Sequence, residues 1–470
     1  MMLAALALVA IVTQDSAALR AAPRDSAQQQ AVLWQGDSLE VRGEKMDYLQ
    51  VYDHRRERGG YIRASQVRTQ SLEPKDAPDL LAVVRFLRDT PGAEALGISY
   101  AAAYLKAAPA EAIGPEPFDA LGTMADRLAR RASAKRGKTD DAVLSAHLEV
   151  ASSYGIAMQG FERDGRVQLC YNGEAFRRVL AMKSNDGQRA RAALALTRPE
   201  CVDPNITPTD RNSLDAWRAD VLDRVQLTEL PEYEKNRLHL RRAGVWASIA
   251  FERARLRQPA QDAANRALQE LAAVNKTEIA EPDAAAYTDA AVRVAASRWA
   301  AEPEPVAATA GGLAVITAPG ESGETCVTLV DAKHDQKNPL FKRCTYGLVW
   351  KASVSVNAQQ SALALAVQPL DSWRELWVFH QGDKGWSVDI LPPAANAPDV
   401  GYLEFAGWVP GSAKMLAVRE ARVDGHFKRS FEVLRMDSID VEKQADNPRS
   451  LSLFYKWQDP AWKRGTLSLR

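Results

Sequence analysis

Hydrophobic and polar residues alternate with a period of two between residues 31 and 68. This alternation is typical of β-strands that bury one face, and the glycines between the runs favour tight turns. We therefore expect several short strands joined by turns in this region. The alternating pairs are Val32 and Trp34, Leu39 and Val41, and Leu49 and Val51.

A second pattern runs from Pro78 to about Trp299, where apolar residues follow the period of an α-helix and alanine is abundant. Leu80, Val84 and Leu87, for example, fall at i, i+4 and i+7 and form one apolar stripe. We expect a helical domain over residues 78–300, arranged as a bundle or an irregular solenoid. The further expected helices lie near residues 93–107, 117–132, 139–161, 174–182, 187–196, 209–225, 233–256, 260–274 and 283–299.

A third region follows a break in the helical pattern. Glu302-Pro303-Glu304-Pro305 and the small residues after it cannot extend a helix, which predicts a linker over residues 301–312. Beyond it, short apolar runs separated by turn residues predict a β-rich domain over residues 313–470. The expected strands lie near residues 313–316, 326–330, 346–354, 362–367, 375–380, 386–391, 402–408, 415–419, 430–436, 451–457 and 466–469.

Three short motifs in the first region follow the pattern of one small barrel family: a Gly-Asp strand, an Asp-aromatic-Leu strand and a closing Gly-aromatic turn. They are Gly36-Asp37-Ser38-Leu39-Glu40-Val41, Asp47-Tyr48-Leu49-Gln50-Val51 and Gly60-Tyr61-Ile62-Arg63-Ala64-Ser65. On these residues the chain resembles the bacterial SH3-like domain, which implies a small β-barrel over residues 28–70.

The same resemblance names candidate binding residues. Leu49 and Val51 share one face of their strand and should be core, which turns Tyr48 outward. In SH3-like domains that position commonly carries a ligand-facing aromatic, and Tyr61 is placed similarly. Binding of a proline-rich segment is disfavoured, because Arg63 and Gln66 replace residues that this mode uses. Two interpretations stay open for the tyrosines, simple barrel packing or a recognition surface that also includes Trp34.

A spaced similarity recurs in the last region at intervals of about 50 residues. The three segments begin at Val356, Trp408 and Trp457, and each resembles the turn of the propeller-type repeats found in exported β-propeller proteins. The resemblance implies strands grouped in repeats. About three such units fit into the region, fewer than the four blades of a closed propeller, so a twisted open sheet or a sandwich is an equal alternative.

The first residues bear on the compartment. Leu3 to Val12 form an unbroken apolar run, which is followed by polar and small residues. The run is too short to cross a membrane as a helix, so we interpret residues 1–22 as a cleaved signal peptide and the protein as periplasmic or secreted. No Lys or Arg precedes the run, as such a peptide would normally have. The alternative is a cytosolic protein with a short apolar first element.

The four cysteines are Cys170, Cys201, Cys326 and Cys344. Their spacing matches no metal-binding pattern. Two of them lie in the helical region and two in the strand-rich region, which favours local pairing of Cys170 with Cys201 and of Cys326 with Cys344. In an oxidising compartment both bridges would form, whereas a cytosolic protein would keep four buried thiols.

Composition and charge exclude several classes of protein. The 470 residues are 46% hydrophobic and 26% charged, which rules out a disordered polyelectrolyte and a polytopic membrane protein. Lys plus Arg and Asp plus Glu are both 60, so no global basic field attracts nucleic acid. We expect a multidomain α+β protein, with an SH3-like barrel, an all-α bundle or solenoid, and an all-β part of partial-propeller or sandwich type.

We find no catalytic, cofactor or metal constellation in the sequence. The six histidines are dispersed, and carboxylate pairs fall at a helix start and in the linker. Tryptophans gather in the last region, either as core residues or as a stacking surface for sugar or peptide. They are Trp373, Trp377, Trp386, Trp408, Trp457 and Trp462.

These observations favour an exported, non-enzymatic binding or scaffold protein of the cell envelope. We expect it to recognise a protein or a cell-wall glycan or peptide, with no cofactor, no nucleic acid and no stable membrane insertion after signal cleavage. The alternative is a cell-envelope hydrolase, or the accessory subunit of one, whose scattered acidic residues converge only in the fold.

Overall fold

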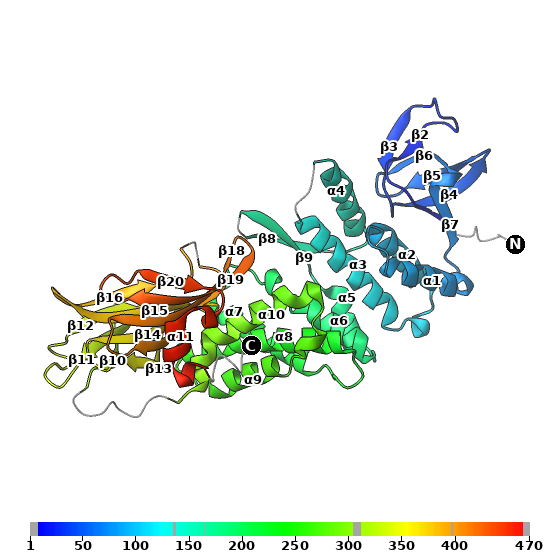
Figure 1. Cartoon of the computed structure of the whole chain (residues 1–470). Coiled ribbons are helices and arrows are strands. Elements are labelled where there is room, and N and C mark those ends of the chain that lie inside the picture. The colour runs from blue at the N-terminus through cyan, green and yellow to red at the C-terminus, as the bar shows by residue number, and fades with distance from the viewer. Residues whose placement is uncertain (1–7, 135–137, 164, 304–311, 396–397, 464–470) are drawn as a thin grey trace. The chain divides into compact units, whose positions relative to one another are not determined.

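The structure, a computed structural model, is a mixed α+β fold (Figure 1) and describes residues 8–134, 138–163, 165–303, 312–395 and 398–463. Contacts within the chain divide it into two compact units. Unit 1 comprises Met1–Thr207 and Arg224–Leu230, and unit 2 comprises Pro208–Asp223 and Pro231–Arg470. Most of the expected linker, residues 304–311, and the strand expected at 466–469 lie outside the described residues.

Unit 1 begins with a seven-stranded antiparallel sheet of strand order β3-β2-β6-β5-β4-β1-β7. Leu39, Leu49, Val51 and Ile62 point to one face and form its core, as the alternating pattern predicts. The strands are β1 (Leu8–Val12), β2 (Ala17–Arg20), β3 (Gln29–Leu33), β4 (Ser38–Lys45), β5 (Tyr48–Asp53), β6 (Arg58–Arg63) and β7 (Val67–Ser71).

The apolar run at the start of the chain has a different role from the one expected. Leu8–Val12 form β1, which pairs with β4 and β7, and Ala10, Ile11 and Val12 are fully buried. Cleavage near residue 22 would remove β1 and β2 from the interior of the sheet. The interpretation of residues 1–22 as a cleaved signal peptide therefore does not fit the structure at residues 8–22, where the end of the apolar run forms a core strand. Residues 1–7 lie outside the described part of the chain.

Six α-helices and one hairpin complete the described part of unit 1. Ile11 of β1 packs with Leu80, Ile98 and Leu128 in one hydrophobic cluster, so the sheet and the helices share a core. The helices are α1 (Ala77–Arg88), α2 (Glu94–Ala107), α3 (Glu116–Ser133), α4 (Lys138–Ser153), α5 (Glu174–Ala181) and α6 (Asp186–Leu196). The hairpin consists of β8 (Met158–Arg163) and β9 (Arg166–Tyr171), and its first strand occupies part of the helix expected at 139–161.

Unit 2 combines the last four long helices with the C-terminal strands. Leu240 of α8 and Val292 of α10 share a cluster with Val418 and Phe431 of the sheet. The single helical domain expected over 78–300 is therefore divided, because its second half buries its apolar faces against strands. The helices are α7 (Pro208–Asp223), α8 (Glu232–Arg255), α9 (Gln261–Ala272) and α10 (Ala284–Ser297).

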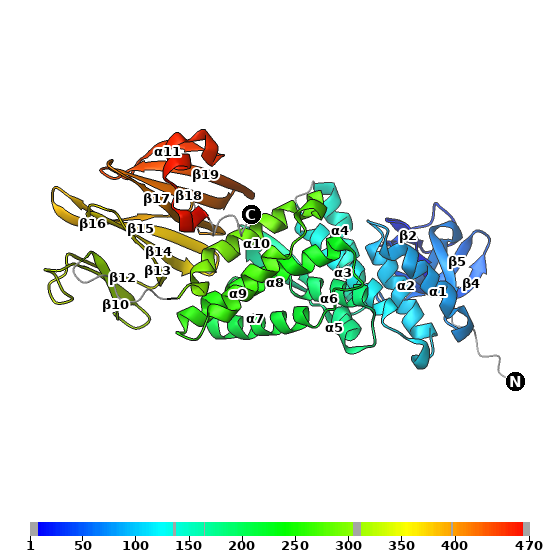
Figure 2. The ribbon, with the colours of Figure 1, turned by 60° about the horizontal axis from the view of Figure 1, so that its bottom comes forward.

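The strands of unit 2 form a three-stranded sheet and an eight-stranded sheet (Figure 2). In the larger sheet, β13 to β16 and β17 to β20 are two antiparallel four-stranded meanders, joined where β15 and β17 pair in parallel. The strands are β10 (Ala314–Pro319), β11 (Thr325–Val330), β12 (Phe341–Thr345), β13 (Leu348–Val356), β14 (Ala362–Leu370), β15 (Trp373–Gly382), β16 (Gly385–Leu391), β17 (Gly401–Val409), β18 (Lys414–Val423), β19 (His426–Arg435) and β20 (Val441–Ala445).

Two of the three repeated segments occupy equivalent places in the two meanders. Val356 pairs with Leu363 across the β13–β14 turn, and Trp408 pairs with Met415 across the β17–β18 turn. The third segment does not start a further meander, since Trp457 ends helix α11 (Ser452–Trp457). The strand expected at 451–457 is therefore wrong. Leu451 and Phe454, three residues apart, are buried in the shared core of unit 2, which favours a helical turn.

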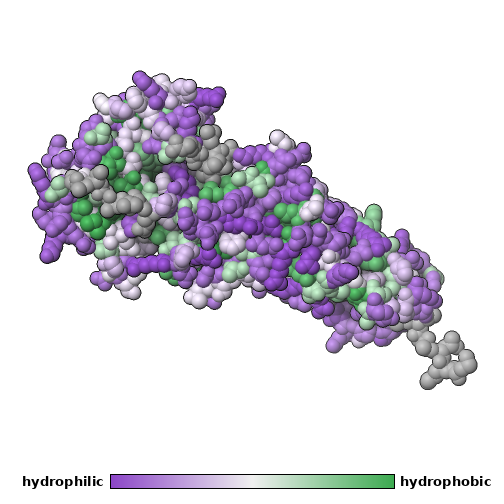
Figure 3. Space-filling view, turned by 90° about the horizontal axis from the view of Figure 1, so that it is seen from below, coloured by the Kyte–Doolittle hydropathy of each residue, from purple (hydrophilic) through white to green (hydrophobic). Residues whose placement is uncertain are grey.

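The surface of the protein is mainly hydrophilic on the face shown in Figure 3, as expected for a chain in which 26% of the residues are charged. On this face, hydrophobic residues appear as separate patches. Among the described residues, no helix combines the length and the apolar character needed to cross a membrane.

Candidate functional site

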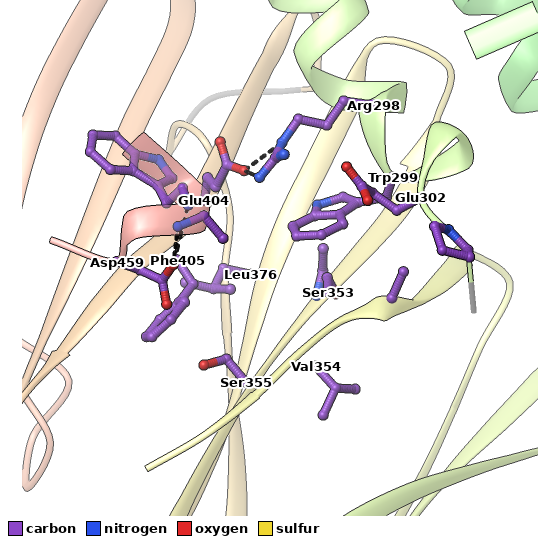
Figure 4. A pocket seen from close by; sticks show the side chains of 15 residues that line it. Arg298, Trp299, Glu302, Ser353, Val354, Ser355, Leu376, Glu404, Phe405 and Asp459 are labelled. Carbon is purple, nitrogen blue, oxygen red and sulfur yellow. Dashed lines mark hydrogen bonds and ion pairs between the residues drawn. The ribbon is translucent and has the colours of Figure 1, made fainter. Parts of the chain in front are cut away.

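A pocket of about 560 Å³ lies in unit 2 between the two meanders and the end of α10. Its residues come from four strands, from the 3₁₀ turn that continues α10 (Arg298–Ala301), and from the segment after α11. Figure 4 shows Trp299 and Glu302 on one side of the pocket and Phe405 and Asp459 on the other. The lining residues that carry the argument are Arg298, Trp299, Glu302, Glu404, Phe405 and Trp462.

Arg298 fixes two other residues of the pocket. Its Nε donates a hydrogen bond to Oε1 of Glu404 at 2.7 Å (Figure 4). Its guanidinium carbon also lies 4.1 Å from the centroid of the Trp299 ring, which is a cation–π contact. One side chain at the end of α10 therefore orients both an aromatic wall and a carboxylate that comes from β17.

Glu404 also faces a second, deeper arginine. Arg374 of β15 is fully buried, and its Nη2 lies 3.5 Å from Oε2 of Glu404. Burial lowers the pKa of Arg374 to about 10, although Glu404 favours its charged form. Nη1 of Arg374 donates to the carbonyl oxygen of Ala295 at 2.6 Å. This cluster of charged residues links β15, β17 and α10 and holds the wall of the pocket in place.

Two aromatic residues of the lining, Trp299 and Trp462, carry indole hydrogen-bond donors. The indole nitrogens of Trp299 and Trp462 are buried and have no hydrogen-bond partner among the described residues. Trp462 is only 6% exposed. A buried donor without a partner is costly, so these two N–H groups favour a bound molecule that offers acceptors.

The segment after α11 is held against β17 by close backbone contacts. Asp459 donates its backbone N–H to the carbonyl of Ala406 at 2.7 Å, and its side chain accepts from the N–H groups of Ala461 and Trp462. A Cβ at Gly407 would lie 2.5 Å from the carbonyl oxygen of Trp457. A residue without a side chain at position 407 therefore lets the segment approach and places Trp462 in the wall.

The polar groups of the pocket are arranged for binding rather than for proton transfer. Glu404 is paired with arginines, and Asp459 caps a turn. Ser353 donates to the carbonyl of Trp350, and Ser355 accepts from Trp408 Nε1 at 3.1 Å. Neither serine has a general base among its hydrogen-bond partners in the described part of the chain, so these residues assemble no nucleophile–base pair here.

A second hollow, of about 610 Å³, lies on the sheet of unit 1. It is lined by residues such as Val41, Arg42 and Thr69, and no aromatic residue is among its described lining residues. None of the buried side-chain atoms without a hydrogen-bond partner in the described chain belongs to that lining. The pocket of unit 2 is therefore the stronger candidate.

The structure separates the three binding residues expected from the SH3-like resemblance. Tyr48 and Tyr61 lie on the same face of β5 and β6, opposite to the core, as strand parity predicts. Trp34 follows β3, which β2 separates from β6 in the strand order. The sheet therefore places the two tyrosines near one another and Trp34 apart from them.

Although it faces outward, Tyr48 is only 2% exposed. Its hydroxyl donates to Asp25 Oδ1 at 2.6 Å, and the guanidinium of Arg63 lies 5.2 Å from its ring centroid. Hydrogen bonds from Arg63 and Tyr48 lower the pKa of Asp25 to about 2. Tyr48 is thus covered by its own chain and offers little surface to a partner, whereas Tyr61 is half-buried.

We expect replacement of Tyr48 by Ala to lower the melting temperature of the full chain clearly, because the substitution removes a buried ring and its hydrogen bond. The matched variant Tyr61→Ala should melt close to the wild type. Thermal unfolding followed by circular dichroism compares the two. Equal stability of both variants would contradict the burial of Tyr48.

The six tryptophans that gather in the last region of the sequence do not share one role. Trp373 and Trp377 are core residues, whereas Trp462 alone of the six lines the pocket. The residues that the sequence did not single out are Arg298, Trp299, Glu404 and Phe405. Their only sequence signal is an arginine–tryptophan pair at the end of a predicted helix.

Both expected disulfides are present. Cys170 of β9 is bonded to Cys201, and Cys326 is bonded to Cys344 on the neighbouring strand. Glu324 lies close to the second pair, and among the described residues these three form the only group with metal-ligand spacing. Because both sulfurs are joined to each other, they do not provide thiolate ligands for a metal.

Comparison of the chain with family models, with curated proteins and with solved structures found no match. Its function has to be inferred from the residues of the pocket.

Proposed function

We propose that this is an exported, non-enzymatic binding protein of the cell envelope, which recognises a protein or cell-wall partner through the pocket of unit 2. The observation that carries the proposal is the pair of buried indole N–H groups without a partner among the described residues, in a pocket where Glu404, Asp459 and the two serines are engaged in structural contacts. Such a pocket offers contact area and donors but no assembled catalytic group.

The two disulfides support the proposal that the protein is exported. Cys170–Cys201 and Cys326–Cys344 use all four cysteines, and structural disulfides persist mainly in oxidising compartments. Export would have to use a signal other than residues 8–22, since these belong to the sheet.

Two finer assignments of fold belong to the same proposal. We assign residues 28–70, which form part of the sheet of residues 8–71, to an SH3-like barrel, supported by the short antiparallel strands and by the motifs around Leu39, Leu49 and Ile62. We assign the two four-stranded meanders to propeller-type repeats, supported by the equivalent turns at Val356 and Trp408. Neither assignment by itself implies a ligand.

The proposal is tested by sedimentation of the full chain with insoluble cell-envelope material. We expect saturable binding that falls about thirtyfold in affinity for Trp299→Ala, because truncation of an aromatic anchor costs about 2 kcal/mol or more. Tyr455→Ala is the matched control, since this tyrosine is an exposed aromatic of α11 that does not line the pocket.

The same samples distinguish binding from hydrolysis. We expect no time-dependent release of soluble sugar or peptide from the envelope material. Steady release by the wild type would favour the hydrolase alternative. Binding that is unchanged in Trp299→Ala would contradict the assignment of the pocket as the binding site.

A further inference from the structure

We propose that the pocket of unit 2 binds a neutral saccharide, an inference that rests on the proposed function and specifies its ligand. Three properties of the pocket lead to this class: unpartnered donors, an aromatic surface, and charges that disfavour both anions and cations.

The donors set the first requirement. Trp299 Nε1 and Trp462 Nε1 belong to lining residues and have no hydrogen-bond partner among the described residues, so a ligand with acceptor oxygens would satisfy them. The exposed Glu302 also lines the pocket, and its ionised carboxylate accepts hydrogen bonds but cannot donate them. The ligand must therefore offer both acceptors and donors, and a hydroxyl group provides both at a single atom.

The charges set the second requirement. The described lining contains three carboxylates, Glu302, Glu404 and Asp459, against one arginine. Arg374 beside the pocket also pairs with Glu404, so Glu302 and Asp459 carry the remaining negative charge, which disfavours an anionic ligand. The same carboxylates attract a cation, but Arg298 already occupies the face of the Trp299 ring on which a cation would stack, and it would repel a second cation there. A neutral molecule meets neither penalty.

Size and shape set the third requirement. A volume of about 560 Å³ is in the range of small-molecule sites and limits the ligand to a compact group. Trp299, Phe405 and Trp462 provide flat apolar surface, on which the C–H face of a sugar ring can lie while its hydroxyls reach the indole and carboxylate groups at the edges. A peptide of the same volume carries only one backbone donor and one acceptor per residue, so it meets these demands less well.

The experiment is a titration of the full chain, followed by calorimetry and tryptophan fluorescence, with defined probes. The neutral probes are the trimers of N-acetylglucosamine, of β-1,4-linked glucose and of α-1,4-linked glucose. The comparison probes are a glucuronate-containing trisaccharide and a neutral tripeptide. We expect at least one neutral trisaccharide to bind saturably and the glucuronate-containing one to bind at least tenfold more weakly.

Variants that remove only the N–H groups locate the binding. Trp299→Phe and Trp462→Phe keep an aromatic ring, and each should weaken binding of the neutral probe about fivefold, since each loses one hydrogen bond. Trp386→Phe is the matched control, because this half-buried tryptophan belongs to the same unit and does not line the pocket.

Four results would count against the inference, and the last of them also against the proposed function. Failure of all neutral trisaccharides to bind, or binding that neither Trp299→Phe nor Trp462→Phe weakens, would exclude this ligand class at this pocket. Binding of the tripeptide alone, if lost in Trp299→Phe, would refute the saccharide while leaving the binding function of the pocket intact. Binding to envelope material that is unchanged in Trp299→Ala would contradict the proposed function as well.

Discussion

Glu94→Gln should destabilise unit 1 by about 3 kcal/mol, since a fully buried carboxylate that pairs with two arginines is lost. Glu94 accepts from Arg127 Nε at 2.6 Å and from the backbone N–H of Gly92 at 3.0 Å, and it also pairs with Arg131. The glutamine leaves these guanidinium groups without a counter-charge. The estimate is at the lower end for a buried pair because both arginines partly reach solvent.

The pH dependence of the free energy of unfolding provides a second test of the buried Glu94 pair. Burial alone would raise the pKa of Glu94, but the hydrogen bond from Gly92 and the two arginines outweigh it, so the pKa in the folded protein is lowered. The unfolded-state pKa of a glutamate is near 4.3, so above about pH 4.3 the ionised Glu94 stabilises the folded protein. This stabilisation is lost as the pH falls through the lower folded-state pKa. Glu94→Gln should therefore flatten the acid side of the stability profile.

The measurement is urea unfolding of the wild type and Glu94→Gln between pH 3 and pH 7. The matched control is Glu116→Gln, because Glu116 pairs with Arg85 at a partly exposed position of the same unit. This control should cost less than about 1 kcal/mol. A loss in Glu94→Gln no larger than in the control would show that the buried pair is not formed.

Removing the disulfide of unit 1 should have the second large effect. The Cys170–Cys201 bond closes a loop with a sequence separation of 31 residues, and loop-closure entropy gives it about 3 to 4 kcal/mol. Cys170→Ala with Cys201→Ala should therefore lower the stability of the native state by this amount. The bond also joins β9 to the segment after α6, so the hairpin should be the first part to lose protection in the variant.

Urea unfolding followed by hydrogen exchange measures both effects. The matched variant, Cys326→Ala with Cys344→Ala, opens a separation of 18 residues in unit 2 and should leave the exchange of the β8–β9 hairpin unchanged. Equal exchange of this hairpin in the wild type and in the variant lacking Cys170 and Cys201 would contradict the structural role of the first bond.

Much of the local structure could be predicted because it depends on residues that are close in sequence. The apolar stripes that predict helices near 93–107, 117–132 and 233–256 lie within α2, α3 and α8 or differ from them by one or two residues at the ends. The pairing of the cysteines follows from their positions in two separate regions. The repeated turns at Val356 and Trp408 follow from a similarity that is visible in the sequence itself.

Other features depend on the tertiary fold and could not be predicted in this way. The apolar run that ends at Val12 fits a signal peptide and a core strand equally, and only the pairing of Leu8–Val12 with β4 and β7 distinguishes the two. Residues 451–457 alternate like a strand, but packing of Phe454 against Phe431 and Trp462 favours a helix. The pocket joins Arg298 to Glu404, which are 106 residues apart and meet only after the helices pack on the sheet.

The most direct test of the binding site is hydrogen–deuterium exchange of the full chain with and without soluble fragments released by enzymatic digestion of the cell wall. A ligand in the pocket of unit 2 should slow exchange in peptides that cover residues 298–303 and 402–405, while peptides over residues 48–63 exchange as in the free protein. Protection confined to residues 48–63, with none in the pocket, would contradict this account and move the binding site to the N-terminal sheet.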